Sequence, residues 1–341
     1  MRRFALLFDL PCNWVAAMPY LIGTDEAGYG PNLGPLVVSA SVWWVAEPTT
    51  GYAGDDLYKR LRAVVCQSTP RGGSVRRLAI ADSKALYSPA QGLGVLERGV
   101  LAALGLIDRC PGDWLDVWQM LDAASIAHLP SMPWHLNYDL RLPLAADLDD
   151  LARLVPKLRR GFETAGVRLV AIESRAVFPE RFNRSADQFG NKSEALSKIT
   201  LGLMADVLKR CAGEPVAIVC DKHGGRNYYG RLLQQQFPDP LIEVSCESNA
   251  QSIYRWGAPE ERIEVCFRSG GEAFMPAALA SMASKYLREL SMRAFNDFWC
   301  GRVRDLSPTA GYPLDARRFK AAIREEQSAL GIDDRILWRN R

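Results

Sequence analysis

Two adjacent carboxylates end a short apolar segment and are followed at once by a glycine-flanked turn. Asp25 and Glu26 come directly after residues 20–24, and Gly28, Tyr29 and Gly30 follow. Where a strand ends and its pleat breaks, neighbouring side chains can face one site, and glycine lets a backbone approach a ligand closely. The pattern indicates a metal ion held beside a polyanion. A solvated acidic pair in a hairpin turn is the alternative that this motif alone leaves open.

A third carboxylate, Asp221, closes the cleanest buried strand expected in the chain, residues 215–221. Functional residues of open α/β sheets gather at the carboxyl ends of strands. The loop that follows, Lys222-His223-Gly224-Gly225-Arg226, is basic and flexible and suits phosphate groups. An aspartate at a strand end is also a common turn former, and that is the alternative for Asp221.

A fourth carboxylate, Glu289, is expected in the middle of a long helix, one turn from Lys285 and Arg293. A surface ion pair is the alternative for a helical Glu with basic neighbours at this spacing. Carboxylates that converge on one site repel one another unless cations hold them, and oxygen ligands without a soft ligand nearby favour Mg²⁺ or Mn²⁺. Two such ions activate a water and stabilise the leaving oxygen of a phosphodiester. The chemistry indicated is phosphodiester hydrolysis.

Five segments of the chain, in the same order, resemble the type 2 ribonucleases H, the bacterial ribonuclease HII and HIII group. They are Gly23-Thr24-Asp25-Glu26-Ala27-Gly28-x-Gly30-Pro31 with Gly34-Pro35-Leu36-Val37-Val38; Asp82-Ser83-Lys84-x-Leu86; Asp221 at a strand end; Ala280-Ser281-Met282-x-Ser284-Lys285-x-x-Arg288-Glu289; and Gly311-Tyr312-Pro313. The match spans roughly residues 20–320. Five motifs in the right order are far more specific than any one of them.

The resemblance implies a ribonuclease H-like fold and a metal-dependent endoribonuclease. Its substrate would be the RNA strand of RNA–DNA hybrids, or DNA with embedded ribonucleotides, cut by a two-metal-ion mechanism. The resemblance also implies that Asp25, Glu26, Asp221 and Glu289 are the catalytic residues and ligate two Mg²⁺ or Mn²⁺ ions.

The same resemblance implies that the Gly28-Tyr29-Gly30 backbone, with Tyr312, reads the ribonucleotide. The chemistry agrees, because backbone groups in a glycine turn can hydrogen-bond the 2′-hydroxyl that distinguishes RNA from DNA. Four basic residues are further candidates for contacts with backbone phosphates: Lys84, Lys222, Arg226 and Arg288.

Three features depart from the family pattern. Tyr29 stands where the family usually has Arg or Lys, which removes a cation beside the scissile region. Glu289 is one methylene longer than the family's Asp. The chain also contains insertions near residues 51–75, 105–145 and 223–265, which would either cap the substrate groove or merely decorate it.

Two other functions stay open at the level of sequence. One is a nucleic-acid-binding protein that keeps the fold but has lost turnover, and the other is a metal nuclease that acts on DNA alone. The retained acidic residues argue against the first, because an idle cluster would contribute only repulsion.

The elements that must position these residues alternate between strands and helices. Strands are expected at 20–24, 36–45, 116–126, 168–173, 215–221, 241–246 and 262–268, and helices at 88–104, 147–165, 193–211, 276–299 and 315–329. This order predicts an α/β fold, with a central mixed sheet flanked by helices and a C-terminal helical extension. We expect one catalytic domain over 18–341, preceded by a loosely ordered extension over 1–17.

Composition narrows the class of protein. The 341 residues are 48% hydrophobic and 24% charged, with a net charge of +3, so any surface that binds nucleic acid must be local. The eight cysteines show no C-x-x-C spacing, which favours reduced thiols in a cytoplasm over zinc ligation or a disulfide framework. No segment is long and apolar enough to span a membrane, and no feature indicates an obligate protein partner.

Overall fold

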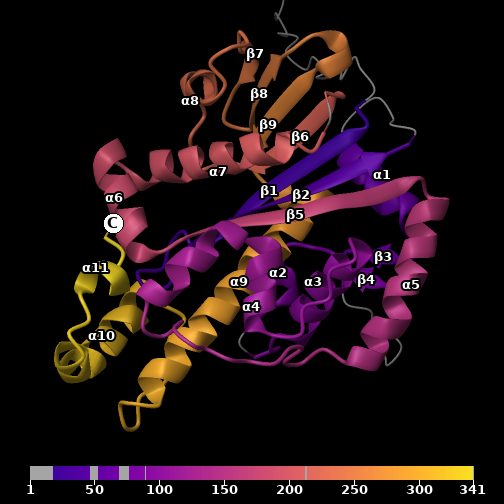
Figure 1. Ribbon diagram of the computed structural model, residues 1–341. Helices are drawn as coiled ribbons and strands as arrows, with labels where there is room; N and C mark the ends of the chain where they lie inside the picture. The colour runs from indigo at the N-terminus through magenta and orange to yellow at the C-terminus, as the bar shows by residue number, and fades with distance from the viewer. Residues whose placement is uncertain (1–17, 47–52, 69–76, 89, 212, 341) are drawn as a thin grey trace, which may run out of the picture.

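A seven-stranded mixed sheet lies at the centre of the molecule (Figure 1). The computed structural model describes residues 18–46, 53–68, 77–88, 90–211 and 213–340, so the predicted extension at 1–17 and part of the 51–75 segment lie outside the described residues. In sheet order the strands are β5 (Val167–Val177), β2 (Leu36–Val45), β1 (Tyr20–Ala27), β6 (Val216–Asp221), β9 (Ile263–Arg268), β8 (Gln251–Trp256) and β7 (Glu243–Glu247). The predicted mixed sheet is confirmed.

Three neighbouring strands of this sheet run in the same direction. β1 is parallel to β6, and β6 is parallel to β9, whereas β2, β5, β8 and β7 complete the sheet through antiparallel pairs. The register places Thr24 opposite Cys220 and Asp221 opposite Arg268. The carboxyl ends of β1, β6 and β9 therefore meet at one end of the sheet.

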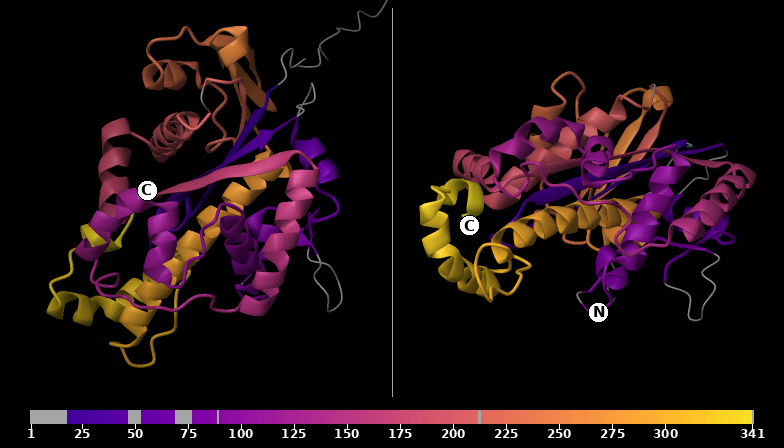
Figure 2. Two further views of the ribbon diagram at one scale, coloured as in Figure 1. Left: turned by 45° about the vertical axis from the view of Figure 1, so that its right-hand side comes forward. Right: turned by 60° about the horizontal axis from the view of Figure 1, so that its bottom comes forward.

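Helices cover both faces of the sheet, and Figure 2 shows the sheet between the two helical layers. On one face α9 packs against β1 and β2, and α4 and α5 pack against β5; on the other face α7 packs against β2 and β5. The helices are α1 (Ala53–Arg60), α2 (Ser83–Leu86), α3 (Gly94–Leu106), α4 (Trp114–Leu121), η1 (Ala123–Ser131), α5 (Leu148–Thr164), α6 (Pro179–Phe189), α7 (Lys192–Leu208), α8 (Gly230–Gln236), η2 (Pro259–Glu261), η3 (Gly271–Ala273), α9 (Met275–Cys300), α10 (Pro313–Ala329) and α11 (Asp334–Leu337). A short pair, β3 (Val65–Cys66) and β4 (Leu78–Ala79), lies outside the main sheet.

Strand β1 is buried on both faces because its side chains alternate between two apolar cores. Leu21 packs in the core on the α9 side, and Ile22 packs in the core that contains the α7 side chains. The central strands thus read as continuous apolar runs. Burial on both sides fixes the register at which the strand reaches Asp25 and Glu26.

Helix α9 lies directly on β1, and the contact depends on Gly23. A Cβ atom at Gly23 would lie 1.9 Å from the Ala277 backbone nitrogen. The Ser41 hydroxyl on β2 donates to the Pro276 carbonyl at 2.7 Å. The first turn of α9 is therefore held against the sheet, close to the strand ends that contain the acidic residues.

Several sequence-based predictions of secondary structure change. The helix expected from residue 88 begins at Gly94, and α6 was not predicted. Residues 116–126 are helical, in α4 and η1, rather than a strand. Asp113 caps α4 by accepting a hydrogen bond from the Asp116 amide, and Trp114, Val117 and Trp118 are buried on one face at helical spacing. The 223–265 segment contains α8, β7 and the unpredicted β8, so it extends the central sheet.

Candidate active site

Asp25, Glu26 and Asp221 come together at the carboxyl ends of β1 and β6. Both strands run in parallel up to the Thr24–Cys220 pair, so the next residue on each strand is acidic. Asp221 contributes to the electrostatic environment of both Asp25 and Glu26. The structure therefore brings these three predicted carboxylates together.

Burial makes Asp25 and Glu26 reluctant to ionise without a cation. Burial raises the pKa of Asp25 to about 7; a hydrogen bond from Ser281 opposes this shift, and the charges of Asp221 and Asp82 add to it. Burial, followed by the charges of Asp25 and Asp221, raises the pKa of Glu26 to about 8. Carboxyl groups in this state gain most from a positive charge placed among them.

Lys84 supplies one such charge in the metal-free protein. The charge of Asp82 raises the pKa of the Lys84 ammonium against the opposing effect of burial, and Asp25, Glu272 and Asp221 raise it further. Lys84 is itself exposed. Its ammonium thus faces acidic residues from four separate segments of the chain.

Glu272 is an acidic neighbour of the site that the sequence reasoning missed. It lies in η3, just after β9, and the neighbouring Gly271 amide donates to Asp221 Oδ1 at 3.4 Å. β9 is parallel to β6, so Glu272, which follows the last residue of β9 in the next short helix, lies at the same end of the sheet as Asp221. The same strand-end rule that singled out Asp221 was the signal for Glu272.

Glu289 lies elsewhere on α9. Its carboxylate accepts hydrogen bonds from Tyr87 Oη at 2.8 Å and Lys285 Nζ at 2.5 Å. It follows Ser281 by eight residues, which is about 12 Å along a helix. The structure therefore gives Glu289 the ion pair that the sequence left as the alternative, and its role as a metal ligand stays a prediction.

The turn after Glu26 has a backbone that requires glycine at its first position. Gly28 has φ of +88°, and a Cβ there would lie 2.6 Å from the Pro35 carbonyl oxygen. The Asn32 amide donates to the Gly311 carbonyl at 2.8 Å, which brings the neighbouring Tyr312 to this turn. Tyr312 is 56% exposed. The predicted Gly28-Tyr29-Gly30 and Tyr312 segments are thus adjacent in the structure.

The four predicted phosphate contacts have different environments. Lys84 is exposed beside the carboxylates, whereas Lys222 Nζ donates to Asn227 Oδ1 at 2.5 Å and the Ser248 carbonyl at 2.6 Å. Arg226 forms an ion pair with Glu194 at 4.0 Å. Arg288 is buried, and its guanidinium donates to the carbonyls of residues 33, 35 and 310. Arg288 therefore holds the backbone of the turn and is not available to a phosphate.

Tyr29 lies near Glu26 and has a cation beside its ring. The Lys192 ammonium lies 4.6 Å from the centre of the Tyr29 ring. Burial raises the pKa of the Tyr29 phenol, as does the charge of Glu26, while Arg226 lowers it. Lys192, at the start of α7, thus places a cation beside the Tyr29 ring. Sequence alone gave no signal for this pairing, because the two residues lie far apart in the chain.

The residues at the site fit a hard divalent cation in their chemistry. The donors are carboxylate oxygens from β1, β6 and η3, which suit Mg²⁺ or Mn²⁺, and burial leaves Asp25 and Glu26 in need of positive charge. Within the described residues, no group of three or more acidic, histidine or cysteine side chains already has an arrangement that would hold a metal ion. The carboxylates therefore lie near one another, but their oxygens are not already arranged as a complete set of metal ligands.

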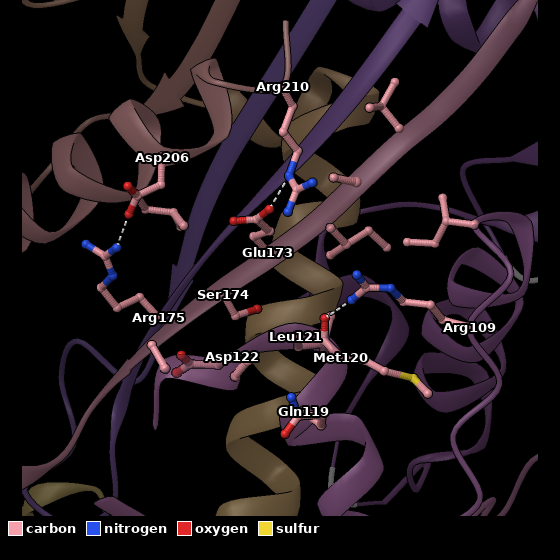
Figure 3. A pocket seen from close by; sticks show the side chains of 17 residues that line it. Arg109, Gln119, Met120, Leu121, Asp122, Glu173, Ser174, Arg175, Asp206 and Arg210 are labelled. Carbon is pink, nitrogen blue, oxygen red and sulfur yellow. Dashed lines mark hydrogen bonds and ion pairs between the residues drawn. The ribbon is translucent and has the colours of Figure 1, made fainter. Parts of the chain in front are cut away.

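A separate pocket of about 350 Å³ opens along the edge strand β5 (Figure 3). Its arginines already have partners: Arg175 pairs with Asp206, Arg210 pairs with Glu173, and Arg109 donates to the Met120 carbonyl. None of the predicted site residues lines it. Since its guanidinium groups are occupied, this pocket offers little to an anionic ligand.

Comparison with known proteins finds similar solved structures at low sequence identity. No family model matches the chain, and no curated protein matches it. Solved structures similar to it include the ribonuclease H2 from Pyrococcus horikoshii OT3, with 15% identity, a TM-score of 0.45 and coverage of 93% of this chain and 92% of that one.

Two further solved structures are similar to the chain. RNase HII in the PCNA:RNase HII complex from Archaeoglobus fulgidus has 15% identity, a TM-score of 0.39 and coverage of 94% of each chain. Bst-RNase HIII in complex with Mn²⁺ has 14% identity, a TM-score of 0.41 and coverage of 95% of this chain and 67% of that one. At this distance, the chemistry of the site must rest on its own residues.

None of the helices in the described part of the chain has the combination of length and apolar character needed to cross a membrane. The cysteines at positions 66, 110, 211, 220, 246, 266 and 300 are free thiols.

Proposed function

We propose that this protein is a metal-dependent endoribonuclease that hydrolyses the RNA strand of RNA–DNA hybrids, and DNA at embedded ribonucleotides. The observation that supports this most is the convergence of Asp25, Glu26 and Asp221 at parallel strand ends, directly beside a glycine turn. The order of the five sequence motifs supports the same function. Residues 18–341 would act as one catalytic domain.

The acidic residues would hold the catalytic ions. Asp25, Glu26 and Asp221 would be ligands, as expected from the sequence. Glu272, whose charge acts on the Lys84 ammonium together with those of Asp25 and Asp221, would compete with Glu289 for the fourth position. Two bound Mg²⁺ or Mn²⁺ ions would supply an activated water and stabilise charge on the leaving oxygen. Before ions bind, the Lys84 ammonium limits the repulsion among these carboxylates.

Residues around the turn would recognise the substrate. The Gly28-Tyr29-Gly30 backbone would hydrogen-bond the 2′-hydroxyl of the ribonucleotide. Tyr312 presents an exposed ring beside the turn and can stack on a sugar or base. Lys84 and Lys192 would contact backbone phosphates near the scissile bond, with Lys222 and Arg226 as further candidates.

A panel of three end-labelled substrates tests the function. The purified protein is incubated with Mg²⁺ or Mn²⁺ and a continuous RNA–DNA hybrid, a DNA duplex with one embedded ribonucleotide, or an all-DNA duplex. Cleavage of the first two and not of the third is the expected result. Binding of the hybrid without cleavage under every metal condition would identify a binding protein, and cleavage of the all-DNA duplex would identify a DNA nuclease.

A further inference from the structure

Arg339 is a buried arginine whose backbone pairs with the turn after the catalytic strand. The Arg339 amide donates to the Asn32 carbonyl at 2.8 Å, and Asn32 Nδ2 donates to the Arg339 carbonyl at 2.9 Å. Leu33 and Trp338 form an isolated antiparallel bridge. The segment after α11 therefore lies along the turn as a short added strand.

Helix α6 holds this segment from the other side. Asn183 Nδ2 donates to the Trp338 carbonyl at 2.8 Å, and the Asn340 amide donates to Asn183 Oδ1 at 2.7 Å. Figure 1 shows α11 beside α6. Residues 338–340 are thus fixed on both sides, which limits where the Arg339 side chain can lie.

The guanidinium of Arg339 joins the two ends of the turn. Its Nη2 donates to the Gly28 carbonyl at 2.5 Å and also to the Pro31 carbonyl. Its charged carbon lies 4.9 Å from the centre of the Phe182 ring, so the group is held between α6 and the turn. One side chain therefore sets the distance between residues 28 and 31.

The burial of Arg339 lowers the stability of the folded protein. Arg339 is only 1% exposed, and its Nε and Nη1 atoms are buried without a hydrogen-bond partner. A buried cation with unmet donors lowers the stability of a fold. Such a cost is often found at functional sites, where the surrounding structure holds a group in place for a purpose.

The carbonyls that Arg339 holds belong to the segment next to the carboxylates. With the Gly28 and Pro31 carbonyls turned to the guanidinium, the intervening Tyr29 is left near Glu26, and Gly30 is exposed. Arg288 holds the following carbonyls of residues 33 and 35. Two buried arginines thus form hydrogen bonds with successive carbonyls of one turn.

We infer that Arg339 is a positioning residue that fixes the Gly28–Pro31 turn in the conformation that recognises the ribonucleotide. This inference rests on the proposed function for what the turn binds. The turn's dependence on Arg339 is a separate statement, which can be measured without substrate. Recognition by a backbone turn requires its groups to be fixed to within a fraction of an ångström.

The test uses the full chain with Arg339→Ala and Arg339→Lys, and Arg335→Ala as the matched control. Arg335 is also in the α11 region, but its side chain is 76% exposed and pairs with Asp333. Amide hydrogen exchange in residues 28–34 is expected to be about tenfold faster in Arg339→Ala, with β6 unchanged. Arg335→Ala should match the wild type.

The kinetic readout separates positioning from general destabilisation. In Arg339→Ala, kcat/KM for a hybrid should fall by about 100-fold. The ratio of kcat/KM for a ribonucleotide substrate to that for a deoxyribonucleotide substrate should become smaller. Free guanidinium ion should restore part of the lost activity. Arg339→Lys keeps the positive charge and should fold even if the alanine variant does not. Its loss of kcat/KM should be intermediate between those of the wild type and Arg339→Ala.

Two results would overturn the inference: unchanged exchange in residues 28–34, or faster exchange spread equally over the turn and β6. Unchanged discrimination in a variant with a loosened turn would also overturn it. If the wild type cleaves no ribonucleotide-containing substrate, the proposed function fails, and the exchange data alone still decide whether Arg339 holds the turn.

Discussion

Glu272 and Glu289 give the site two competing candidates for a fourth acidic residue. Glu272 follows β9 and faces Lys84 together with Asp25 and Asp221, whereas Glu289 is engaged by Tyr87 and Lys285. We therefore expect Glu272→Gln to lower hybrid cleavage by about 100-fold or more, and Glu289→Gln to change it by less than about threefold.

Each substitution keeps the size of the side chain and removes one negative charge, so each serves as the control for the other. Initial rates on one hybrid at saturating Mg²⁺ give the comparison. The opposite order of the two effects would restore Glu289 as the metal ligand.

The half-buried acidic pair, Asp25 and Glu26, also predicts how the stability of the metal-free protein depends on pH. Burial raises the pKa of Asp25 from 3.8 to about 7 and that of Glu26 from 4.5 to about 8. The folded state keeps protons that the unfolded state has released, so the stability present below about pH 4 is lost as the pH rises to about 8. The free energy of unfolding should therefore fall across this window.

Urea unfolding in a chelator, at about pH 5 and about pH 8.5, measures this loss. Asp25→Asn should reduce the pH dependence, and Mg²⁺ should stabilise the wild type most at the higher pH. An equal pH dependence in the wild type and in Asp25→Asn would show that Asp25 ionises normally.

Lys192 is expected to provide the cation that Tyr29 does not. Lys192→Ala should weaken binding of a hybrid by several-fold and reduce the slope of log affinity against log salt by about one. Lys209→Ala is the control, because Lys209 follows the other end of α7 and pairs with Asp206. Fluorescence anisotropy with a non-cleavable hybrid gives both slopes, and equal slopes for the two variants would exclude a phosphate contact by Lys192.

At the scale of elements, the packing of α9 on β1 decides where the site can form. Because a Cβ at Gly23 would meet the α9 backbone, Gly23→Ala should lower the free energy of unfolding by ~3 kcal/mol or more. Gly30→Ala is a suitable comparison for stability, because nothing lies within 4 Å of a Cβ there. Thermal unfolding measures both, and a Gly23→Ala variant as stable as the wild type would contradict this close contact.

The sequence predicted the elements that have a clear period or a clear boundary. The strands of β1, β2 and β6 and the helix of α9 were predicted because long apolar runs and a regular stripe mark them. The apolar residues of segment 116–126 suggested a strand, and that prediction was wrong. The Asp113 cap and the burial of Trp114 and Trp118 on one face make the segment helical.

The same limits apply to the candidate site. Asp25, Glu26 and Asp221 could be predicted because each ends a strand. Whether Glu289 reaches the ions depends on the rotation and the position of α9, which residue spacing alone does not give, so its ligand role stays a prediction. Glu272 was missed because it follows a short strand and a pair of glycines that resemble an ordinary turn.

At the scale of the whole molecule, the turn at residues 28–35 is built by distant parts of the chain. Arg288 and Arg339 donate hydrogen bonds to carbonyls of this turn, and Arg288 also bonds to the Ala310 carbonyl. Arg339 lies 311 positions from Gly28 in the chain. Such contacts leave no local signal in the sequence. The 223–265 segment is a second example. Its strands extend the edge of the central sheet, and the sequence did not indicate this role.

The central claim is that the carboxylates at the β1 and β6 ends hold the ions that hydrolyse a ribonucleotide linkage. Cleavage of a duplex containing a ribonucleotide by the wild type and by Asp25→Asn, each with Mn²⁺, tests it most directly. The proposed function predicts cleavage by the wild type and a loss of at least about 1000-fold in Asp25→Asn, in a variant that remains folded. Full activity of Asp25→Asn would contradict the metal-ligand role of Asp25.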